Sequence, residues 1–359
     1  MISIDILFDE LSPAELDKAY RWLVKVRPPF AAVFAGARFE QAQGYAAGIA
    51  RNLGIRVILR NSGARGGNPD IATDDGIHTR MTPAEWVDRH CLPLKDTGCI
   101  IACDNESQRD DMSIYAHWQA RALDLAGEAG IGLAVGKQAT GNPAEHQYAQ
   151  MDALWHGLHK WRALSVYSPH EYHAQTPQLS GGHVNRYMLA WERCKQIGIA
   201  PPVTVIGEYG YLCSDGSRLD PEHGFRRDGI SGRDAANMDI AYHRDWYARP
   251  PLNAAGQAGV TVCAYAFCGN SGKWRDMNVN DDGWLDTIAA YNATLRLPVP
   301  TPPIIDPPIP PEPPPAQSRY VTIERAEHIR LMQREKDYAA LRGIMDAMIE
   351  QYEQHKEGE

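Results

Sequence analysis

The sequence lacks an excess of positive charge. Its 359 residues include 36 Lys and Arg against 45 Asp and Glu, which gives a formal net charge of -9. Proteins that bind the phosphate backbone of nucleic acids usually present a basic surface. We therefore expect no nucleic-acid partner.

Long apolar runs are also missing. No run approaches the roughly 20 apolar residues that span a bilayer. At the amino terminus, Asp5, Asp9 and Glu10 interrupt the apolar run that a signal peptide requires. We expect no membrane partner and synthesis in the cytoplasm, with later release from the cell as an open alternative.

Motifs for metals and cofactors are scarce. The 7 cysteines contain no CxxC pair, and the sequence has no HExxH, no Walker-type loop and no GxGxxG after its first strand-like run. Asn278, Asn280 and Asp282 approach the start of a calcium loop. However, its twelfth position is Ala289, so the bidentate carboxylate is missing. We expect neither a metal nor a cofactor.

Proline is unevenly distributed. Eleven of the 25 prolines fall between Pro298 and Pro315, a density that favours an extended, semi-rigid spacer over helix or sheet. The chain is thereby divided into residues 1–297, a proline-rich linker at 298–317 and a C-terminal segment at 318–359.

The first 297 residues alternate short β-branched runs with amphipathic helical runs, which is typical of repeated βα units around a parallel sheet. Eight units close naturally into a barrel, so we predict an α/β fold of the (β/α)8 TIM-barrel type. A doubly wound open sheet is the alternative. The eight strands are predicted at residues 2–8, 30–36, 56–61, 99–104, 132–137, 163–167, 203–207 and 260–267.

Helix boundaries carry their own signals. Ser12, Thr82 and Asn142 each precede Pro-Ala-Glu, which combines a capping residue, a proline at the first helical position and a glutamate for a capping box. Glycine marks the expected left-handed helix ends, at Gly54, Gly98, Gly130, Gly198 and Gly259.

The connections that follow strands are long and polar at 62–81, 213–237 and 269–283, whereas those that precede strands are short and apolar. In a βα barrel, the loops after the strands emerge at one face, where active sites are built. This asymmetry predicts a substrate cleft.

Two glutamates stand at the carboxyl ends of predicted strands, Glu106 after the fourth and Glu208 after the seventh. A barrel would deliver both carboxylates to one face. Cleavage of a glycosidic bond uses such a pair, one protonated to assist the leaving oxygen and one ionised to attack or to activate water.

On these residues the sequence resembles the clan A type of retaining glycoside hydrolase, built on the βα barrel. The signature of that clan is an Asn-Glu pair that ends strand four and a nucleophilic glutamate that ends strand seven, here Asn105, Glu106 and Glu208. The resemblance implies that Glu208 is the nucleophile, Glu106 the general acid/base and Asn105 a ligand of the sugar 2-hydroxyl. The implied substrate is a poly- or oligosaccharide.

Many members of the clan carry a His and a Tyr on strand six, where this chain has His170 and Tyr172. The resemblance implies that Tyr172, or alternatively Tyr167, donates a hydrogen bond to the nucleophile. It also implies that His170 lines a substrate subsite.

Two further positions of the clan match less directly. An arginine late in strand two has two candidates here, Arg38 and Arg60, and both are candidate substrate-site residues. A tryptophan often ends strand eight, whereas this strand ends in Phe267, with Trp274 in the polar loop beyond it. Trp274 is a candidate platform for a sugar ring.

Two other interpretations stay open. Asp104 and Glu106 form a DxE pattern that also ends strand four in other barrel hydrolases, including one class of lysozymes. In that muramidase-like arrangement Asp104 supports the acid Glu106, and Glu208 lies behind them. The second interpretation is a non-catalytic carbohydrate-binding or assembly protein.

The C-terminal segment has the seven-residue apolar spacing of a short coiled coil. We expect one helix that self-associates, docks onto a larger assembly or packs on the barrel. A barrel with such a tail and without a signal peptide would also suit a phage-associated enzyme that meets cell-wall glycan after release. The seam residues are Leu331, Tyr338, Leu341, Met345, Met348 and Tyr352.

Overall fold

The computed structural model describes residues 1–61, 81–103, 111–173, 185–214, 219–247, 260–269 and 274–295. These ranges belong to the predicted barrel. The predicted linker and C-terminal helix, with their coiled-coil seam, lie outside the described residues.

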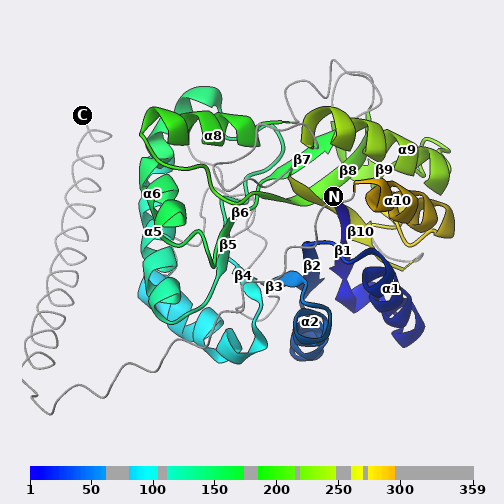
Figure 1. Cartoon of the computed structure of the whole chain (residues 1–359), viewed down its shortest axis with the longest axis horizontal. Helices are drawn as coiled ribbons and strands as arrows, with labels where there is room; N and C mark the ends of the chain where they lie inside the picture. Colours follow the sequence, from blue (N-terminus) through cyan, green and yellow to red (C-terminus); the bar gives the residue numbers. More distant parts are fainter. Residues whose placement is uncertain are drawn as a thin grey trace, which may run out of the picture. The chain divides into compact units, whose positions relative to one another are not determined.

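Parallel strands form a curved sheet around a central axis (Figure 1). Neighbours in the sequence are neighbours in space from β1 to β6, and β8 pairs with β7 and with β10. The ring closes where β10 pairs with β1, with Ile2 opposite Val262. The strands are β1 (Ile2–Leu7), β2 (Phe30–Ala35), β3 (Arg56–Asn61), β4 (Ile100–Ala102), β5 (Leu133–Val135), β6 (Val166–Tyr167), β7 (His170–His173), β8 (Val205–Ser214) and β10 (Thr261–Phe267).

The sixth strand of the barrel is interrupted. β6 pairs with β5 and β7 pairs with β8, and only Ser168 and Pro169 separate the two halves. Proline has no N–H to donate, but its carbonyl accepts from Gly207 N at 2.9 Å, and Tyr167 N donates to Val203 O at 2.9 Å. The two halves therefore complete the ring, and the predicted (β/α)8 barrel is confirmed.

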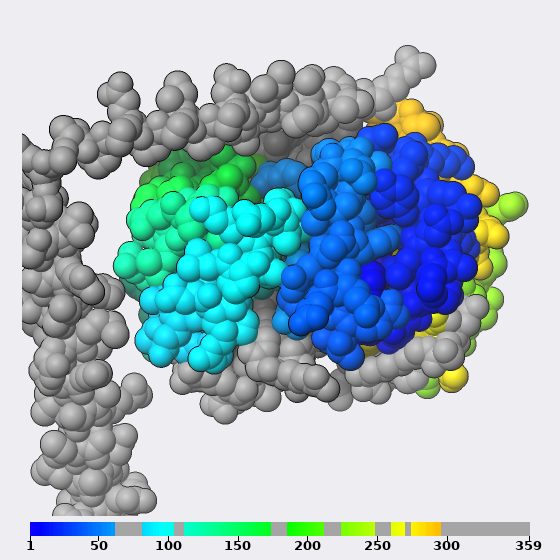
Figure 2. Space-filling model, turned by 90° about the horizontal axis from the view of Figure 1, so that it is seen from below, coloured from blue at the N-terminus to red at the C-terminus, as the bar shows by residue number. Residues whose placement is uncertain are grey.

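Helices cover the outside of this ring (Figure 1). β9 (Leu219–Gly224) lies off the ring and pairs antiparallel with β8. The α-helices are α1 (Pro13–Val26), α2 (Phe39–Leu53), α4 (Pro83–Trp86), α5 (Met112–Glu128), α6 (Asp152–Lys160), α8 (Tyr187–Gln196), α9 (Gly232–Tyr242) and α10 (Asp282–Thr294). Figure 2 shows part of the shell from below, with the blue surface of α1 and α2 beside the cyan surface of the segment that starts at α4.

Two of the three predicted helix starts are confirmed, because Ser12 and Thr82 each form a complete capping box before a proline. The third prediction is wrong. Asn142 N donates to Ala139 O within a turn, and the helical segment begins at Glu145. Gln147 Oε1 accepts from Ala144 N at 2.8 Å. This bond satisfies the amide of Ala144, and the helical segment therefore starts later than predicted.

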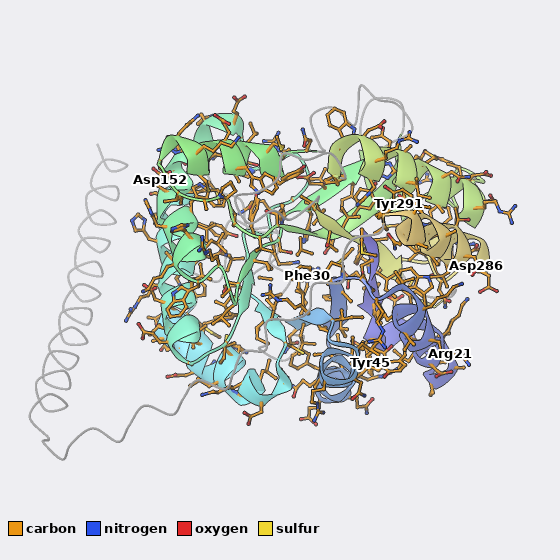
Figure 3. All side chains as sticks on the ribbon, in the orientation of Figure 1. Arg21, Phe30, Tyr45, Asp152, Asp286 and Tyr291 are labelled. Carbon is orange, nitrogen blue, oxygen red and sulfur yellow. The ribbon has the colours of Figure 1, made fainter. Side chains whose placement is uncertain are left out.

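The amino-terminal half of the barrel interior is apolar. Side chains that alternate along the strands point inward and pack together, and Figure 3 shows side chains filling the ring. The carboxyl-terminal half is polar, and the candidate site lies there. The apolar cluster consists of Phe30, Ala32, Ile58, Ile100, Ala102, Ala134, Val166, Val205 and Cys263.

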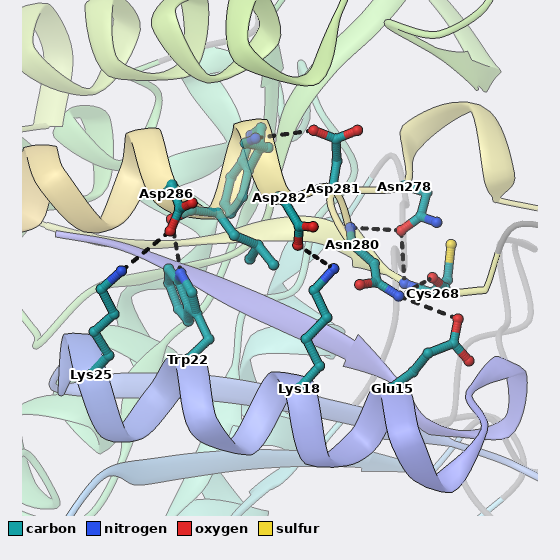
Figure 4. A network of polar contacts seen from close by, with 12 residues as sticks. Glu15, Lys18, Trp22, Lys25, Cys268, Asn278, Asn280, Asp281, Asp282 and Asp286 are labelled. Atoms are coloured by element: carbon teal, nitrogen blue, oxygen red, sulfur yellow. Dashed lines mark hydrogen bonds and ion pairs between the residues drawn. The ribbon is translucent and has the colours of Figure 1, made fainter.

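Polar contacts join α1 to α10 (Figure 4). Lys18 Nζ lies 2.8 Å from Asp282 Oδ1, and Lys25 Nζ lies 3.2 Å from Asp286 Oδ1. Asn278 Oδ1 accepts from Cys268 N at 3.2 Å and from Asn280 N at 2.8 Å. Asn278 and Asp282, two residues of the calcium-like pattern, thus make internal contacts, and Asp282 joins α10 to α1.

Six cysteines in the described ranges are buried and free, and a buried thiol of this kind packs as a small apolar side chain. Within the same ranges, none of the helices combines the length and the apolar character that crossing a bilayer requires.

Candidate active site

Glu208 is the centre of the polar cluster in the carboxyl-terminal half of the barrel. It lies on β8, opposite His170 in the pairing of β7 with β8. Arg60, the penultimate residue of β3, forms an ion pair with Glu208 through Nη1 and Oε1. Both side chains are buried, so water screens this pair little.

The second oxygen of Glu208 faces β7. Tyr172 Oη donates a hydrogen bond to Glu208 Oε2 at 2.6 Å, and His170 Nδ1 lies 3.4 Å from the same oxygen. Tyr167, the alternative donor, is fully buried and packs edge-on against Trp155. The structure therefore brings Tyr172, and not Tyr167, to Glu208.

The environment of Glu208 favours its ionised form. Burial raises the pKa of the carboxyl, but the charges of His170, Arg60 and Lys137 lower it. The hydrogen bond from Tyr172 lowers it further, and the net effect is a pKa below the ordinary value. A carboxylate in this state serves as a nucleophile or base rather than as an acid.

A second buried carboxyl, Asp5 on β1, lies in the same electrostatic environment. Burial and the negative charge of Glu208 raise the pKa of Asp5, whereas the charges of Arg60 and Lys137 lower it. Neither Asp5 nor Lys137 is among the residues predicted for the site. The sequence carried a signal for both residues. Asp5 lies within an apolar strand-like run, and Lys137 lies at the end of another.

Aromatic side chains surround the polar cluster. The ring of Tyr265 lies edge-on to Tyr172 at 6.3 Å and to Trp274 at 5.2 Å between centroids. Phe34 packs in the same cluster, and Arg60 lies over its ring at 4.4 Å. Tyr265 therefore connects Trp274, the predicted sugar platform, to Tyr172 beside Glu208. Trp274 itself is partly exposed.

The alternation of side chains along β7 fixes these groups in place. His170 and Tyr172 contact Glu208, whereas the residues between and after them contact the helical shell. Glu171 accepts from Tyr187 N at 2.9 Å, at the start of α8, and His173 Nε2 lies 2.9 Å from Asp239 Oδ1 on α9. The strand is therefore held on both faces.

Arg38 does not join the site. Its Nη1 donates to Leu11 O at 2.9 Å, and its guanidinium lies 4.5 Å from the ring centroid of Phe8. These contacts tie the segment after β1 to the segment after β2. Of the two candidate arginines, it is therefore Arg60 that contacts Glu208. Arg38 follows the end of β2 by three residues and connects two loops.

Asp104, Asn105 and Glu106 lie outside the described residues. The preceding strand, β4, ends at Ala102, and Cys103 is the last described residue before them. Their assignment therefore continues to rest on the sequence. Within the described part of the chain, no group of three or more His, Cys, Asp or Glu side chains is placed to hold a metal ion.

Comparisons with known proteins find no matching family model and no matching curated protein. Among solved structures, XacCel5A is similar at 10% identity, 74% coverage of this chain, 87% coverage of that chain and a TM-score of 0.43. A Prevotella bryantii endo-beta-mannanase/endo-beta-glucanase is similar at 12% identity, with 80% of this chain and 48% of that chain covered and a TM-score of 0.43.

A truncated 3-deoxy-D-arabino-heptulosonate 7-phosphate synthase from Thermotoga maritima is also similar, at 12% identity and a TM-score of 0.41, with 82% of this chain and 86% of that chain covered. At this level of similarity, function has to be argued from the site itself, because barrels of this kind support many different reactions.

Proposed function

We propose that this protein is a retaining glycoside hydrolase that cleaves O-glycosidic bonds in a poly- or oligosaccharide. The observation that supports the proposal is the buried Glu208 carboxylate, which Arg60 and Tyr172 hold from two sides in the carboxyl-terminal half of the barrel. Active sites of (β/α)8 barrels are built at this end.

The chemistry needs two carboxyl groups with opposite protonation states. In the first step, Glu208 attacks the anomeric carbon while Glu106 donates its proton to the departing glycosidic oxygen, which leaves as an alcohol. In the second step, ionised Glu106 takes a proton from water, and the resulting hydroxide displaces Glu208 from the sugar. Both glutamates regain their starting states, and the anomeric configuration is retained.

The neighbours of Glu208 suit the nucleophile of this scheme. Because its pKa is lowered, the carboxylate is ionised before the sugar arrives. Tyr172 and Arg60 fix its two oxygens, so that little reorientation precedes attack. We assign His170 to the wall of the subsite, Trp274 to a sugar platform and Asn105 to the 2-hydroxyl, with a separation of about 5–5.5 Å between the carboxyl groups of Glu106 and Glu208.

The test is a screen of polysaccharides and peptidoglycan with the purified protein, followed by the variants Glu208→Gln and Glu106→Gln. Each variant should lower kcat by at least about 10³-fold with an unchanged circular dichroism spectrum. NMR of the first anomer released should show retained configuration, and azide added to Glu208→Ala should yield a glycosyl azide.

Other outcomes would redirect the assignment. Activity that survives in Glu208→Gln but not in Glu106→Gln would favour the DxE arrangement with Asp104. Binding of a glycan without turnover, unaffected by either substitution, would favour the non-catalytic interpretation. The matched control for the glutamate variants is Glu192→Gln, because Glu192 is exposed on α8 and pairs with Lys195. A second control is Tyr45→Phe, because Tyr45 donates to Leu16 O on the helical shell.

A further inference from the structure

Lys137 is a buried cation two residues after the end of β5, with a relative exposure of 2%. The backbone turns sharply at this point, since Gly136 has a φ of 70°, a value that favours glycine. Gly136 N donates to Gln119 Oε1 at 3.0 Å, and Gln138 N donates to Gly136 O at 2.9 Å. The position of Lys137 is thus fixed by bonds on both sides.

The ammonium of Lys137 lies against β8 at the residue before Glu208. A Cβ placed on Gly207 would lie 3.1 Å from Lys137 Nζ and 2.6 Å from Ser168 Oγ. Glycine at position 207 therefore leaves the space that the lysine occupies. A charged lysine is rarely buried so deeply without carboxylates nearby, because the loss of hydration is costly.

Two carboxyl groups share the electrostatic influence of this ammonium. Asp5 is 2% exposed and Glu208 is 6% exposed, and the charge of Lys137 acts on both. Asp5 comes from β1, Glu208 from β8 and Lys137 from the end of β5, so three separate parts of the ring meet in the interior.

We propose that Lys137 is a positioning residue whose ammonium is shared between Asp5 and Glu208 and keeps the Glu208 carboxylate ionised. This inference rests on the proposed function for its kinetic consequence. In this role the lysine acts through Glu208. It sets the lower end of the pH range in which the nucleophile is active.

Other charged or titratable groups also surround Glu208 in the described residues. β3 contributes Arg60, β7 contributes His170 and Tyr172, and β1 contributes Asp5. On β10, Cys263 is buried near Asp5 and Lys137, and burial raises the pKa of its thiol. The thiol is therefore neutral, and Lys137 adds to the cationic effect of Arg60.

The test replaces Lys137 with methionine and follows Glu208 directly. Carboxyl ¹³C NMR of glutamate-labelled protein, with the Glu208 signal assigned by its loss in Glu208→Gln, gives the titration midpoint. In Lys137→Met the midpoint should rise by about one pH unit or more, because an opposite charge has been removed. The acid limb of kcat/KM should move upward by the same amount.

A double variant, Asp5→Asn with Lys137→Met, removes the shared cation together with its second carboxyl. The Glu208 midpoint should stay raised in this protein, which also serves as the test if the single variant does not fold. A midpoint at the wild-type value in the double variant would overturn the proposal, because Lys137 would then act only by neutralising Asp5. An unchanged midpoint in Lys137→Met would overturn it as well.

The matched control is Lys160→Met. Lys160 is exposed and pairs with Asp124 at 2.6 Å on the helical shell, so its loss should leave the Glu208 midpoint unchanged. The NMR titration needs no substrate. A shifted midpoint in a protein that turns over no glycan would therefore support the role of Lys137 and contradict the proposed function.

Discussion

The two oxygens of the Glu208 carboxylate have different neighbours, and this difference determines what the group can do. Oε1 pairs with Arg60, whereas Oε2 accepts a hydrogen bond from the Tyr172 hydroxyl. Hydrogen bonds to an ionised partner are stronger than those between neutral groups. Each neighbour therefore stabilises both the charge of the carboxylate and its orientation.

Tyr172→Phe tests how much the hydrogen bond to Glu208 Oε2 contributes to activity. Loss of a hydrogen bond to a charged group costs about 1.5–3 kcal/mol, so we expect kcat/KM to fall about 10- to 100-fold. The acid limb of the pH profile should move upward, because the lost donor had lowered the Glu208 pKa. Steady-state kinetics on the substrate identified by the screen measures both effects.

Tyr45→Phe removes a hydroxyl of the same kind far from Glu208 and should leave kcat/KM and the pH profile unchanged. If Tyr172→Phe behaves like this control, Tyr172 does not support the nucleophile.

Sequence reasoning brought together the part of the site that depends on residue type and strand position. Glu208 follows from counting strands, because residues near the ends of parallel strands share one face. Tyr172 and His170 were expected only from the resemblance to clan A hydrolases. Lys137 and Asp5 could not be paired in this way. The sequence shows two charges in separate apolar runs, and only the closed ring brings strand one close to the end of strand five.

At the scale of elements, Glu171 attaches α8 to β7. Its carboxylate accepts from Tyr187 N at 2.9 Å, Asn185 N at 2.6 Å and Tyr247 Oη at 2.5 Å. Burial raises its pKa to about 7, although these hydrogen bonds and the charge of Arg186 lower it. This carboxyl thus binds a proton more readily in the folded protein than in the unfolded chain.

The stability of the protein should therefore depend on the charge of Glu171. Between the unfolded pKa near 4.5 and the folded pKa of about 7, the folded state holds the extra proton, so the free energy of unfolding falls as pH rises. The loss is on the order of 3 kcal/mol for this group. Glu171→Gln should flatten this part of the pH dependence in urea unfolding experiments.

Glu192→Gln is the comparison, since Glu192 is an exposed residue of α8 that pairs with Lys195 at 3.6 Å. It should keep the wild-type slope. A slope in Glu171→Gln that matches this comparison would contradict the assigned effect.

The predicted strands agree closely with the structure where apolar runs are uninterrupted, as at Arg56–Asn61. The prediction ended the sixth strand too early. Its second half, His170–His173, consists of residues that are polar by type, yet these side chains are buried. The helix start at Asn142 was wrong because two capping signals compete within six residues. Local patterns cannot show which of two such signals the tertiary structure selects.

At the scale of the whole molecule, Asn292 on α10 ties the end of the barrel domain to its first strand. Its Oδ1 accepts from Ile2 N at 3.1 Å and its Nδ2 donates to Ile2 O at 2.7 Å. Asn292→Ala leaves both buried backbone groups without these bonds, and we expect a loss of about 2–4 kcal/mol in stability. Thermal unfolding measures it. Thr294→Ala, an exposed change on the same helix, should cost far less, and equal losses would argue against this role.

A shortened chain of residues 1–297 should keep the barrel and its activity, because the described strand pairs lie between residues 2 and 267. If the C-terminal segment forms the predicted coiled coil, light scattering should show a larger assembly for the full chain than for the shortened one. Equal masses would contradict self-association, and loss of the folded spectrum would contradict an independent barrel.

The pairing of β1 with β10 has a consequence for synthesis on the ribosome. Ile2 lies opposite Val262 in this pairing, and contacts of such high sequence separation form slowly. While the chain emerges, β1 has an unpaired edge until Thr261–Phe267 has been made. We therefore expect folding to be completed only after most of the barrel has been translated, and a chaperone or aggregation to compete for this open edge until then.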